Sequence, residues 1–171
     1  MNTKLAMSLL AYLGLSLFAK ADPLAVGAAA PEISAVDQDG KTVNFKDVYA
    51  KGATLVYFYP KADTPGCTKE ACSIRDSWAD LQAKGIQVLG VSGDKPDAQK
   101  KFADKFKLPH TLIADSDNAV AKAFGVPTLL GISKRQSFLI KDGKVVWNQL
   151  AASTDKQAAD VLAAVESLGK K

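Results

Sequence analysis

Apolar residues recur along the chain with two periods, which predict alternating strands and helices. Residues 53–59 (ATLVYFY) and 86–92 (IQVLGVS) are short apolar runs, rich in branched and aromatic side chains, as is typical of strands buried on both faces of a sheet. Apolar residues three or four positions apart instead predict amphipathic helices. The other predicted strands are a hairpin over 30–45, a strand over 111–114 and a hairpin over 137–149; the predicted helices are 67–83, 94–106, 116–124 and 154–168, and 45–49 is predicted to begin a short connection.

The order of these elements predicts the fold class. A β-hairpin is followed by three β-α units, a second hairpin and a closing helix. Alternating strands and helices predict an α/β sheet covered by helices on both faces, and the C-terminal hairpin makes that sheet mixed. We therefore expect one domain over residues 22–171, with a thioredoxin-like fold that carries an N-terminal β-hairpin extension.

The first 21 residues are expected to be a secretory signal peptide outside the fold. A short basic start is followed by an apolar stretch over 5–18 and by Ala19-Lys20-Ala21, the small–x–small pattern of a cleavage site before Asp22. An uncleaved membrane anchor is the alternative, although a spanning helix needs about 20 apolar residues and this stretch is shorter. We expect a periplasmic or otherwise exported protein without stable membrane association after cleavage.

Charge gives little indication of a partner. Loss of residues 1–21 removes two lysines and no acidic residue, so the net charge falls from +4 (22 basic, 18 acidic) to +2 (20 basic, 18 acidic). The lysine-rich stretch 95–107 has acidic residues interleaved and is typical of a solvated helix face. No basic cluster with aromatic residues suggests nucleic-acid binding.

Two cysteines, Cys67 and Cys72, carry the candidate chemistry. A turn over residues 64–66 ends on Cys67, which is predicted to cap a helix. Unpaired N–H groups and the positive end of the helix dipole favour a thiolate there. An exported protein meets an oxidising compartment, in which a structural disulfide is the ordinary alternative.

The spacing of the cysteines weakens that alternative. Five residues apart on one continuous helix, they lie about 7.5 Å apart along the axis and roughly 140° apart around it. A disulfide needs Cα atoms within about 7 Å, so either the helix does not form or its first turn unwinds when the bond forms. The spacing is not the Cys-x-x-Cys of disulfide exchange enzymes. A metal site lacks ligands, since His110 is the only histidine and is distant in sequence, where a packed or surface position is expected.

The motif around Cys67 resembles a known family. Pro60-x-x-x-Thr64-x-x-Cys67 resembles the active-site signature of peroxiredoxins. The longer run 57–72 (YFYPKADTPGCTKEAC) resembles the peroxiredoxin Q subfamily, also called bacterioferritin comigratory protein. Further segments similar to that subfamily are residues 90–94, 101–102, 121–126 and 135–140.

The resemblance implies a role for five residues. Cys67 is the peroxidatic thiolate that attacks the O–O bond, and Arg135 stabilises it and polarises the peroxide. Thr64 hydrogen-bonds the peroxide, and Pro60 shields the thiol from water. The resulting sulfenic acid condenses with a nearby thiol, which is Cys72, in an intramolecular disulfide.

The implied activity is a thiol-dependent peroxidase, of the thioredoxin-dependent type, that acts on hydrogen peroxide and organic hydroperoxides. It needs no bound cofactor or metal, draws electrons from a thioredoxin-like or other dithiol reductant, and is expected to be a monomer. The chain departs from the family at Ala62, His110 and Lys141, and its export signal leaves the electron donor open. The alternatives are an exported thiol–disulfide oxidoreductase, a metal carrier, and a structural domain with one bridge.

Overall fold

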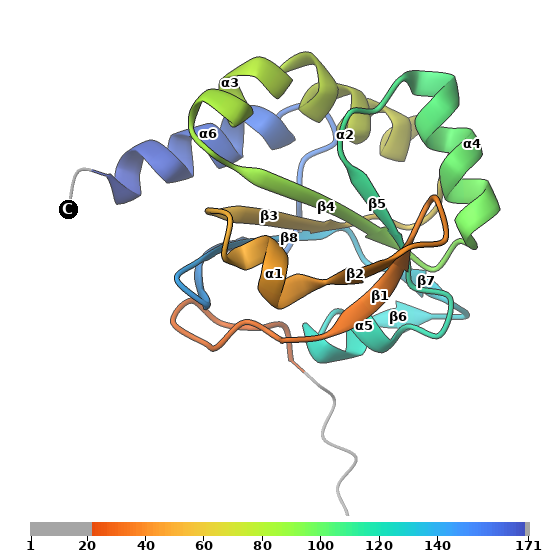
Figure 1. Ribbon diagram of the computed structural model, residues 1–171, viewed down its shortest axis with the longest axis horizontal. Helices are drawn as coiled ribbons and strands as arrows, with labels where there is room; N and C mark the ends of the chain where they lie inside the picture. The colour runs from red at the N-terminus through yellow and green to blue at the C-terminus, as the bar shows by residue number, and fades with distance from the viewer. Residues whose placement is uncertain (1–21, 170–171) are drawn as a thin grey trace, which may run out of the picture.

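A mixed sheet of seven strands forms the centre of the molecule, in the order β2-β1-β5-β4-β3-β8-β9 (Figure 1). The computed structural model describes residues 22–169. Strands β3, β4 and β5 are parallel, and the other neighbours are antiparallel. The strands are β1 (Ser34–Asp37), β2 (Thr42–Asn44), β3 (Thr54–Phe58), β4 (Gln87–Ser92), β5 (Thr111–Ala114), β8 (Gln136–Lys141) and β9 (Lys144–Gln149), and a separate small hairpin is formed by β6 (Thr128–Leu129) and β7 (Ile132–Ser133).

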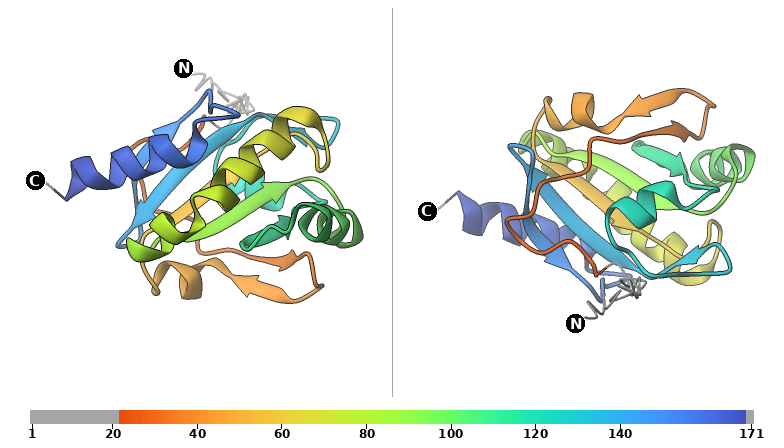
Figure 2. Two further views of the ribbon diagram at one scale, coloured as in Figure 1. Left: turned by 90° about the horizontal axis from the view of Figure 1, so that it is seen from above. Right: turned by 90° about the horizontal axis from the view of Figure 1, so that it is seen from below.

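Helices cover both faces of this sheet. Four of them lie on one face, and the two short ones lie on the other with the N-terminal segment (Figures 1 and 2). The helices are α1 (Phe45–Tyr49), α2 (Pro65–Asp76), α3 (Trp78–Ala83), α4 (Pro96–Phe106), α5 (Ala119–Ala123) and α6 (Gln157–Leu168). The thioredoxin-like α/β fold expected from the sequence is confirmed. Within residues 22–169, no helix is both long and apolar enough to cross a membrane.

The central position of β3 in the sheet explains why its sequence is apolar without alternation. Leu55 and Tyr57 face α2, α3, α4 and α6, whereas Val56 and Phe58 face α1 and α5. All four side chains are fully buried. A strand covered on both faces needs apolar residues at every position, and this central position fixes the end of β3, from which the Cys67 segment starts.

The predicted helix over 67–83 is wrong in its bounds. It is two helices, α2 and α3, separated at Ser77, and α2 begins at Pro65 rather than at Cys67. Thr64 has extended backbone angles and is the N-cap, and Pro65 suits the first helical position because its ring fixes φ and it has no N–H to leave unpaired. Cys67 is therefore the third helical residue, still within the first turn.

The structure differs from the predicted elements at three other places. Residues 45–49 form helix α1, whereas the sequence predicts the start of a connection. Asn44 is the N-cap of this helix, because its Oδ1 accepts the backbone N–H of Lys46 at 3.1 Å. Helix α5 starts later than predicted, because Asn118 has a left-handed backbone with a φ of 58°. The β6–β7 hairpin has no counterpart among the predicted elements.

Candidate active site

Sheet pairing brings the two most important predicted residues together. β3 ends at Phe58 and leads through a loop into α2, while Arg135 immediately precedes β8. Antiparallel pairing of β3 with β8 sets Phe58 opposite Gln136. Arg135 therefore lies next to the start of α2, although it is far from Cys67 in the sequence.

Cys67 lies buried in the first turn of α2, with 1% of its surface exposed. Arg135 Nη2 donates a hydrogen bond to Cys67 Sγ at 3.3 Å. The side chain of Arg135 is 16% exposed and is therefore mostly withdrawn from solvent. A largely buried cation and the N–H groups of a helix start both stabilise negative charge placed next to them, so the site is suited to a sulfur nucleophile.

Glu70 is a third member of this site that sequence reasoning missed. Its side chain is fully buried, and its Oε2 accepts a hydrogen bond from Arg135 Nη1. Burial raises the pKa of Glu70 to about 8, and the charge of Arg135 acts in the opposite direction. Glu70 follows Cys67 by three residues and so lies on the same helix face, which was the only signal in the sequence. Arg135 thus spans the thiol and a buried carboxyl group.

Gly66 lets Arg135 approach the helix closely. A Cβ atom at this position would lie 3.3 Å from Arg135 Nη2 and 3.5 Å from Thr154 Cγ2, closer to the guanidinium than most Cβ contacts. Arg135 also contacts the loop after β9: the backbone N–H of Ala152 donates to the backbone carbonyl of Arg135 at 3.4 Å. The loop after β9 therefore borders the site.

The loop between β3 and α2 is held by a carboxylate at the end of β4. Asp94 Oδ2 accepts the backbone N–H of Ala62 at 2.7 Å and the hydroxyl of Ser92 at 2.7 Å. Pro60 is half-buried and lies in this loop, two residues after the end of β3. The loop, and Pro60 with it, is thereby tied to the sheet.

Thr64 does not cap α2 with its side chain. Its hydroxyl donates to the carbonyl of Lys61 at 2.9 Å, and only its backbone carbonyl accepts from the helix, from the N–H of Thr68 at 2.8 Å. The Thr64 oxygen retains lone pairs that can accept a further hydrogen bond. The first turn of α2 therefore lacks the stabilisation that a side-chain cap usually gives.

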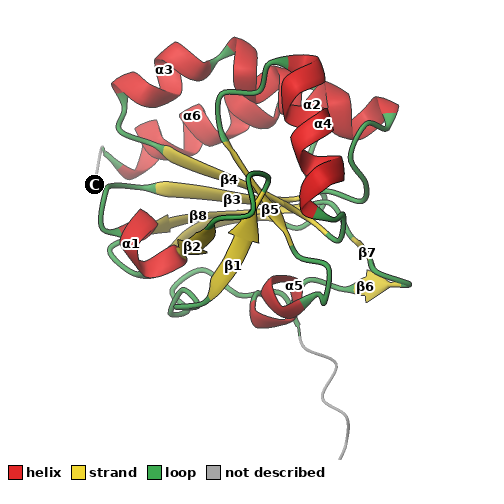
Figure 3. Cartoon of the chain, turned by 45° about the vertical axis from the view of Figure 1, so that its right-hand side comes forward, coloured by secondary structure: helices red, strands yellow, loops and turns green. Residues whose placement is uncertain are grey.

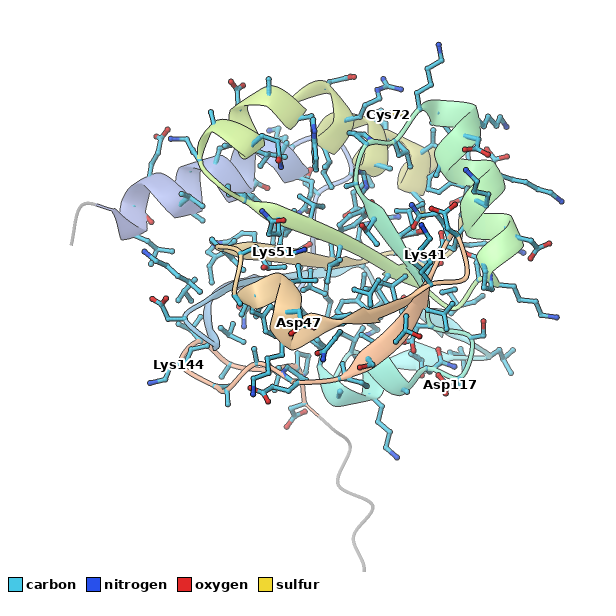
Figure 4. All side chains as sticks on the ribbon, in the orientation of Figure 1. Lys41, Asp47, Lys51, Cys72, Asp117 and Lys144 are labelled. Carbon is cyan, nitrogen blue, oxygen red and sulfur yellow. The ribbon has the colours of Figure 1, made fainter. Side chains whose placement is uncertain are left out.

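Cys72 lies further along the same uninterrupted helix and is half-buried (Figure 4). Both cysteines are free thiols. The sequence expectation that the two share one helix is thus met. At this spacing they cannot bond without local unwinding, because they lie about 7.5 Å apart along the axis.

His110 is packed inside the molecule. The sequence leaves two placements open for it, a packed one and a surface one. Its Nε2 lies 2.8 Å from the hydroxyl of Tyr57, and both side chains are buried. Burial lowers the pKa of His110 to about 3, so the imidazole is neutral at physiological pH. In residues 22–169, no group of three or more His, Cys, Asp or Glu side chains is arranged to hold a metal ion.

The buried imidazole predicts a loss of stability in acid. Below a pH of about 6.5 the histidine of the unfolded chain takes up a proton that His110 in the folded chain refuses until a pH of about 3. The free energy of unfolding should therefore fall with decreasing pH across this window, by at most about 1.4 kcal/mol per pH unit from this group. Urea unfolding at pH 7.5, 6.0 and 5.0 measures it.

His110→Gln is the matched control, because it can still bond to Tyr57 and does not titrate. The variant should lose less stability than the wild type between pH 7.5 and 5.0. The chain has a single histidine, so equal losses in both proteins would contradict the assignment.

Comparison with known proteins identifies the family. The family model "AhpC/TSA family" matches residues 26–148. Peroxiredoxin Bcp of Escherichia coli K12 is 47% identical over 133 residues, which cover 72% of this chain and 84% of the relative. The chain belongs to the peroxiredoxins of the AhpC/TSA family. The resemblance to the peroxiredoxin Q and bacterioferritin comigratory proteins that the motif indicated is confirmed.

Two further peroxiredoxins place the chain in that subfamily. Chloroplastic peroxiredoxin Q of Gentiana triflora is 42% identical over 134 residues; the match covers 77% of this chain but only 60% of the plant protein. The bacterioferritin comigratory protein of Xanthomonas campestris, solved in trapped intermediate/ligand complexes that concern its alkyl peroxide reduction activity, superposes with a TM-score of 0.76 at 27% identity and covers 86% of this chain and 99% of its own.

Proposed function

We propose that this chain is a thiol peroxidase that reduces hydrogen peroxide and organic hydroperoxides, with Cys67 as the attacking thiol. The hydrogen bond from Arg135 to a buried cysteine at a helix start carries the proposal, because it sets a cation beside the sulfur that must carry negative charge to attack a peroxide. Membership of the peroxiredoxins supports it. The alkyl peroxide reduction of the Xanthomonas neighbour supports organic hydroperoxides as substrates.

In the first step, the Cys67 thiolate attacks the terminal oxygen of the peroxide. An S–O bond forms as the O–O bond breaks, and the leaving alkoxide or hydroxide takes up a proton to give an alcohol or water. Arg135 stabilises the negative charge that moves from sulfur to the leaving oxygen. Cys67 becomes a sulfenic acid, so the thiol is oxidised by two electrons and the peroxide is reduced by two.

Thr64 and Pro60 prepare the approach of the peroxide. The Thr64 hydroxyl already donates to the Lys61 carbonyl, so its oxygen accepts the hydrogen bond of the peroxide O–H and orients it. Pro60 has no N–H and is held in the loop next to the sheet, where it limits access of water to Cys67.

In the second step, Cys72 resolves the sulfenic acid. Its thiol forms an S–S bond with Cys67 and water leaves. The first turn of α2 unwinds so that the two sulfurs meet, and its missing side-chain cap makes that opening easier. A thioredoxin-like or other dithiol reductant then returns both thiols by disulfide exchange.

We also propose that residues 1–21 are an export signal and that the domain over 22–171 works as a monomer outside the cytosol. Residues 1–21 lie outside the described residues, so this proposal rests on their sequence pattern alone. Mass measurement of the exported protein tests it: a chain that begins at Asp22 is expected, and a membrane-embedded chain of full length would contradict it.

The activity is tested with the purified domain and a dithiol. Hydrogen peroxide should disappear only in the presence of both, with one dithiol oxidised for each peroxide. One equivalent of peroxide without reductant should leave a protein that is two hydrogens lighter. Failure to consume peroxide, together with reduction of insulin disulfides, would indicate a thiol–disulfide oxidoreductase instead.

A further inference from the structure

Exposed apolar side chains gather around the candidate active site. Within the described chain, six large apolar residues are exposed, and four of them border this region. Leu129 (75% exposed), Leu130 (93%) and Ile132 (48%) belong to the β6–β7 hairpin. Leu150 (47%) belongs to the loop after β9, and its carbonyl accepts a hydrogen bond from the side chain of Gln136, the neighbour of Arg135.

The tip of the β6–β7 hairpin has a residue that folding alone does not favour. Leu130 and Gly131 form a two-residue loop with φ values of 51° and 78°. Such a loop prefers Asn-Gly, because Asn tolerates a left-handed backbone and a bulky apolar residue does not. A strained leucine that is almost fully exposed therefore indicates a role in contacting something outside the molecule.

A groove connects this hairpin with the active-site loop. It has a volume of about 470 Å³ and is lined by Pro60, Pro127, Thr128, Leu129, Ile132, Ser133 and Lys134. The Ser133 hydroxyl donates to the carbonyl of Tyr59 at 3.0 Å, next to Pro60. The hairpin is thus fastened beside the loop that leads to Cys67, while its tip stands at the rim of the molecule (Figure 3).

The size and charge of this surface favour a lipid bilayer over a protein partner. A stable protein interface buries about 800 Å² on each side, to which three side chains on a narrow hairpin contribute only a small part. Apolar side chains that insert between lipid headgroups, with lysines beside them, bind anionic membranes. Lys134 is the one charged residue among those that line the groove, and Lys61 follows Pro60.

We propose that the β6–β7 hairpin docks reversibly on the surface of an anionic lipid bilayer, so that hydroperoxides of bilayer lipids reach Cys67 along the groove. Such a contact differs from the stable anchoring that the sequence argued against. The substrate part rests on the proposed function: the lipid hydroperoxide is reduced to the lipid alcohol in the balanced step already described. The docking itself does not depend on activity.

Docking is tested by sedimentation of the domain over residues 22–171 with vesicles of phosphatidylcholine and phosphatidylglycerol. The wild type should bind, and Leu130→Asn should reduce the binding constant about tenfold, although Asn suits the left-handed backbone and should leave the melting temperature equal or higher. Val26→Asn removes a similarly exposed apolar side chain next to Gly27, whose N–H donates to the carbonyl of Val145 in β9 and not to the hairpin, and should bind as the wild type. Vesicles of phosphatidylcholine alone should bind more weakly.

Activity is measured with peroxidised phosphatidylglycerol in the vesicles and with hydrogen peroxide in solution. The ratio of the two rates should fall about tenfold in Leu130→Asn and stay constant in Val26→Asn. If the wild type reduces no peroxide, the proposed function fails while vesicle binding still tests docking. Absence of vesicle binding by the wild type, or equal binding by Leu130→Asn, would overturn the docking proposal. It would equally be overturned by a wild-type dimer that Leu130→Asn dissociates, since the hairpin would then be a self-interface.

Discussion

Cys72→Ser should reduce peroxide once and then stop, whereas the wild type with a dithiol turns over many times. Both thiols lie on α2, and Cys72 is the only other cysteine in the sequence, so under the proposed function it is the one thiol of the same chain that can remove the sulfenic acid from Cys67. Without it, the sulfenic acid persists and excess peroxide oxidises it further to sulfinic acid. Multiple turnover should therefore fall to the slow rate at which an outside thiol reaches a buried sulfur.

Mass analysis after one equivalent of peroxide separates the possible outcomes. The wild type should lose two hydrogens, and Cys72→Ser should gain one oxygen that dimedone traps. Cys67→Ser is the control that should neither react with peroxide nor form a disulfide. A wild type that gives mainly a disulfide-linked dimer, or that keeps its sulfenic acid, would show that Cys72 is not the resolving residue.

The same experiment reports on the helix. Because the two sulfurs cannot meet in an intact α2, oxidation should speed amide hydrogen exchange across residues 64–75 in the wild type and leave it slow in Cys72→Ser. The first turn is a plausible place for opening, since Thr64 gives it no side-chain cap and helix ends open at low cost.

Much of the fold could be predicted because the signals were local. The apolar run of β3 and the turn before α2 determine their elements through burial and backbone restriction, which neighbouring residues reveal. The β6–β7 hairpin was missed because its loop is Leu130-Gly131, and a leucine does not signal a left-handed turn. The break at Ser77 was missed because apolar spacing continues through it.

The candidate site was predictable only as far as its motif extends. Pro60, Thr64 and Cys67 lie in one segment, and a resemblance indicated Arg135. Glu70 could not be predicted, because its meaning depends on burial and on contact with Arg135. The contact between Glu70 and Arg135 follows from the pairing of β3 with β8, which joins distant parts of the chain. Polar residues acquire such roles through tertiary contacts that a local pattern does not contain.

Arg135→Ala should slow the reaction of Cys67 with peroxide by about 10²–10³-fold, the usual loss when one donor to a developing oxyanion is removed. Its guanidinium contacts Cys67 Sγ and Glu70 Oε2 together, so the variant loses both the cation beside the sulfur and the partner of a buried carboxyl group. Arg135→Lys should recover only part of the rate, since an ammonium cannot reproduce the two-sided contact. Stopped-flow peroxide reduction and iodoacetamide alkylation measure these losses.

Glu70→Gln is the matched control for this prediction, because the amide oxygen still accepts from Arg135 and no longer titrates. Burial raises the pKa of Glu70 to about 8, so below that pH its carboxyl group is mostly neutral and the charge of Arg135 acts on Cys67. Above it, the carboxylate offsets that charge, and the wild type should become slower than Glu70→Gln as the pH rises from 7 to 9. Arg135→Ala/Glu70→Gln removes the unpaired buried acid and should still be about 10²-fold slow; recovery of the wild-type rate in this double variant would show that Arg135 serves Glu70 and not the thiolate.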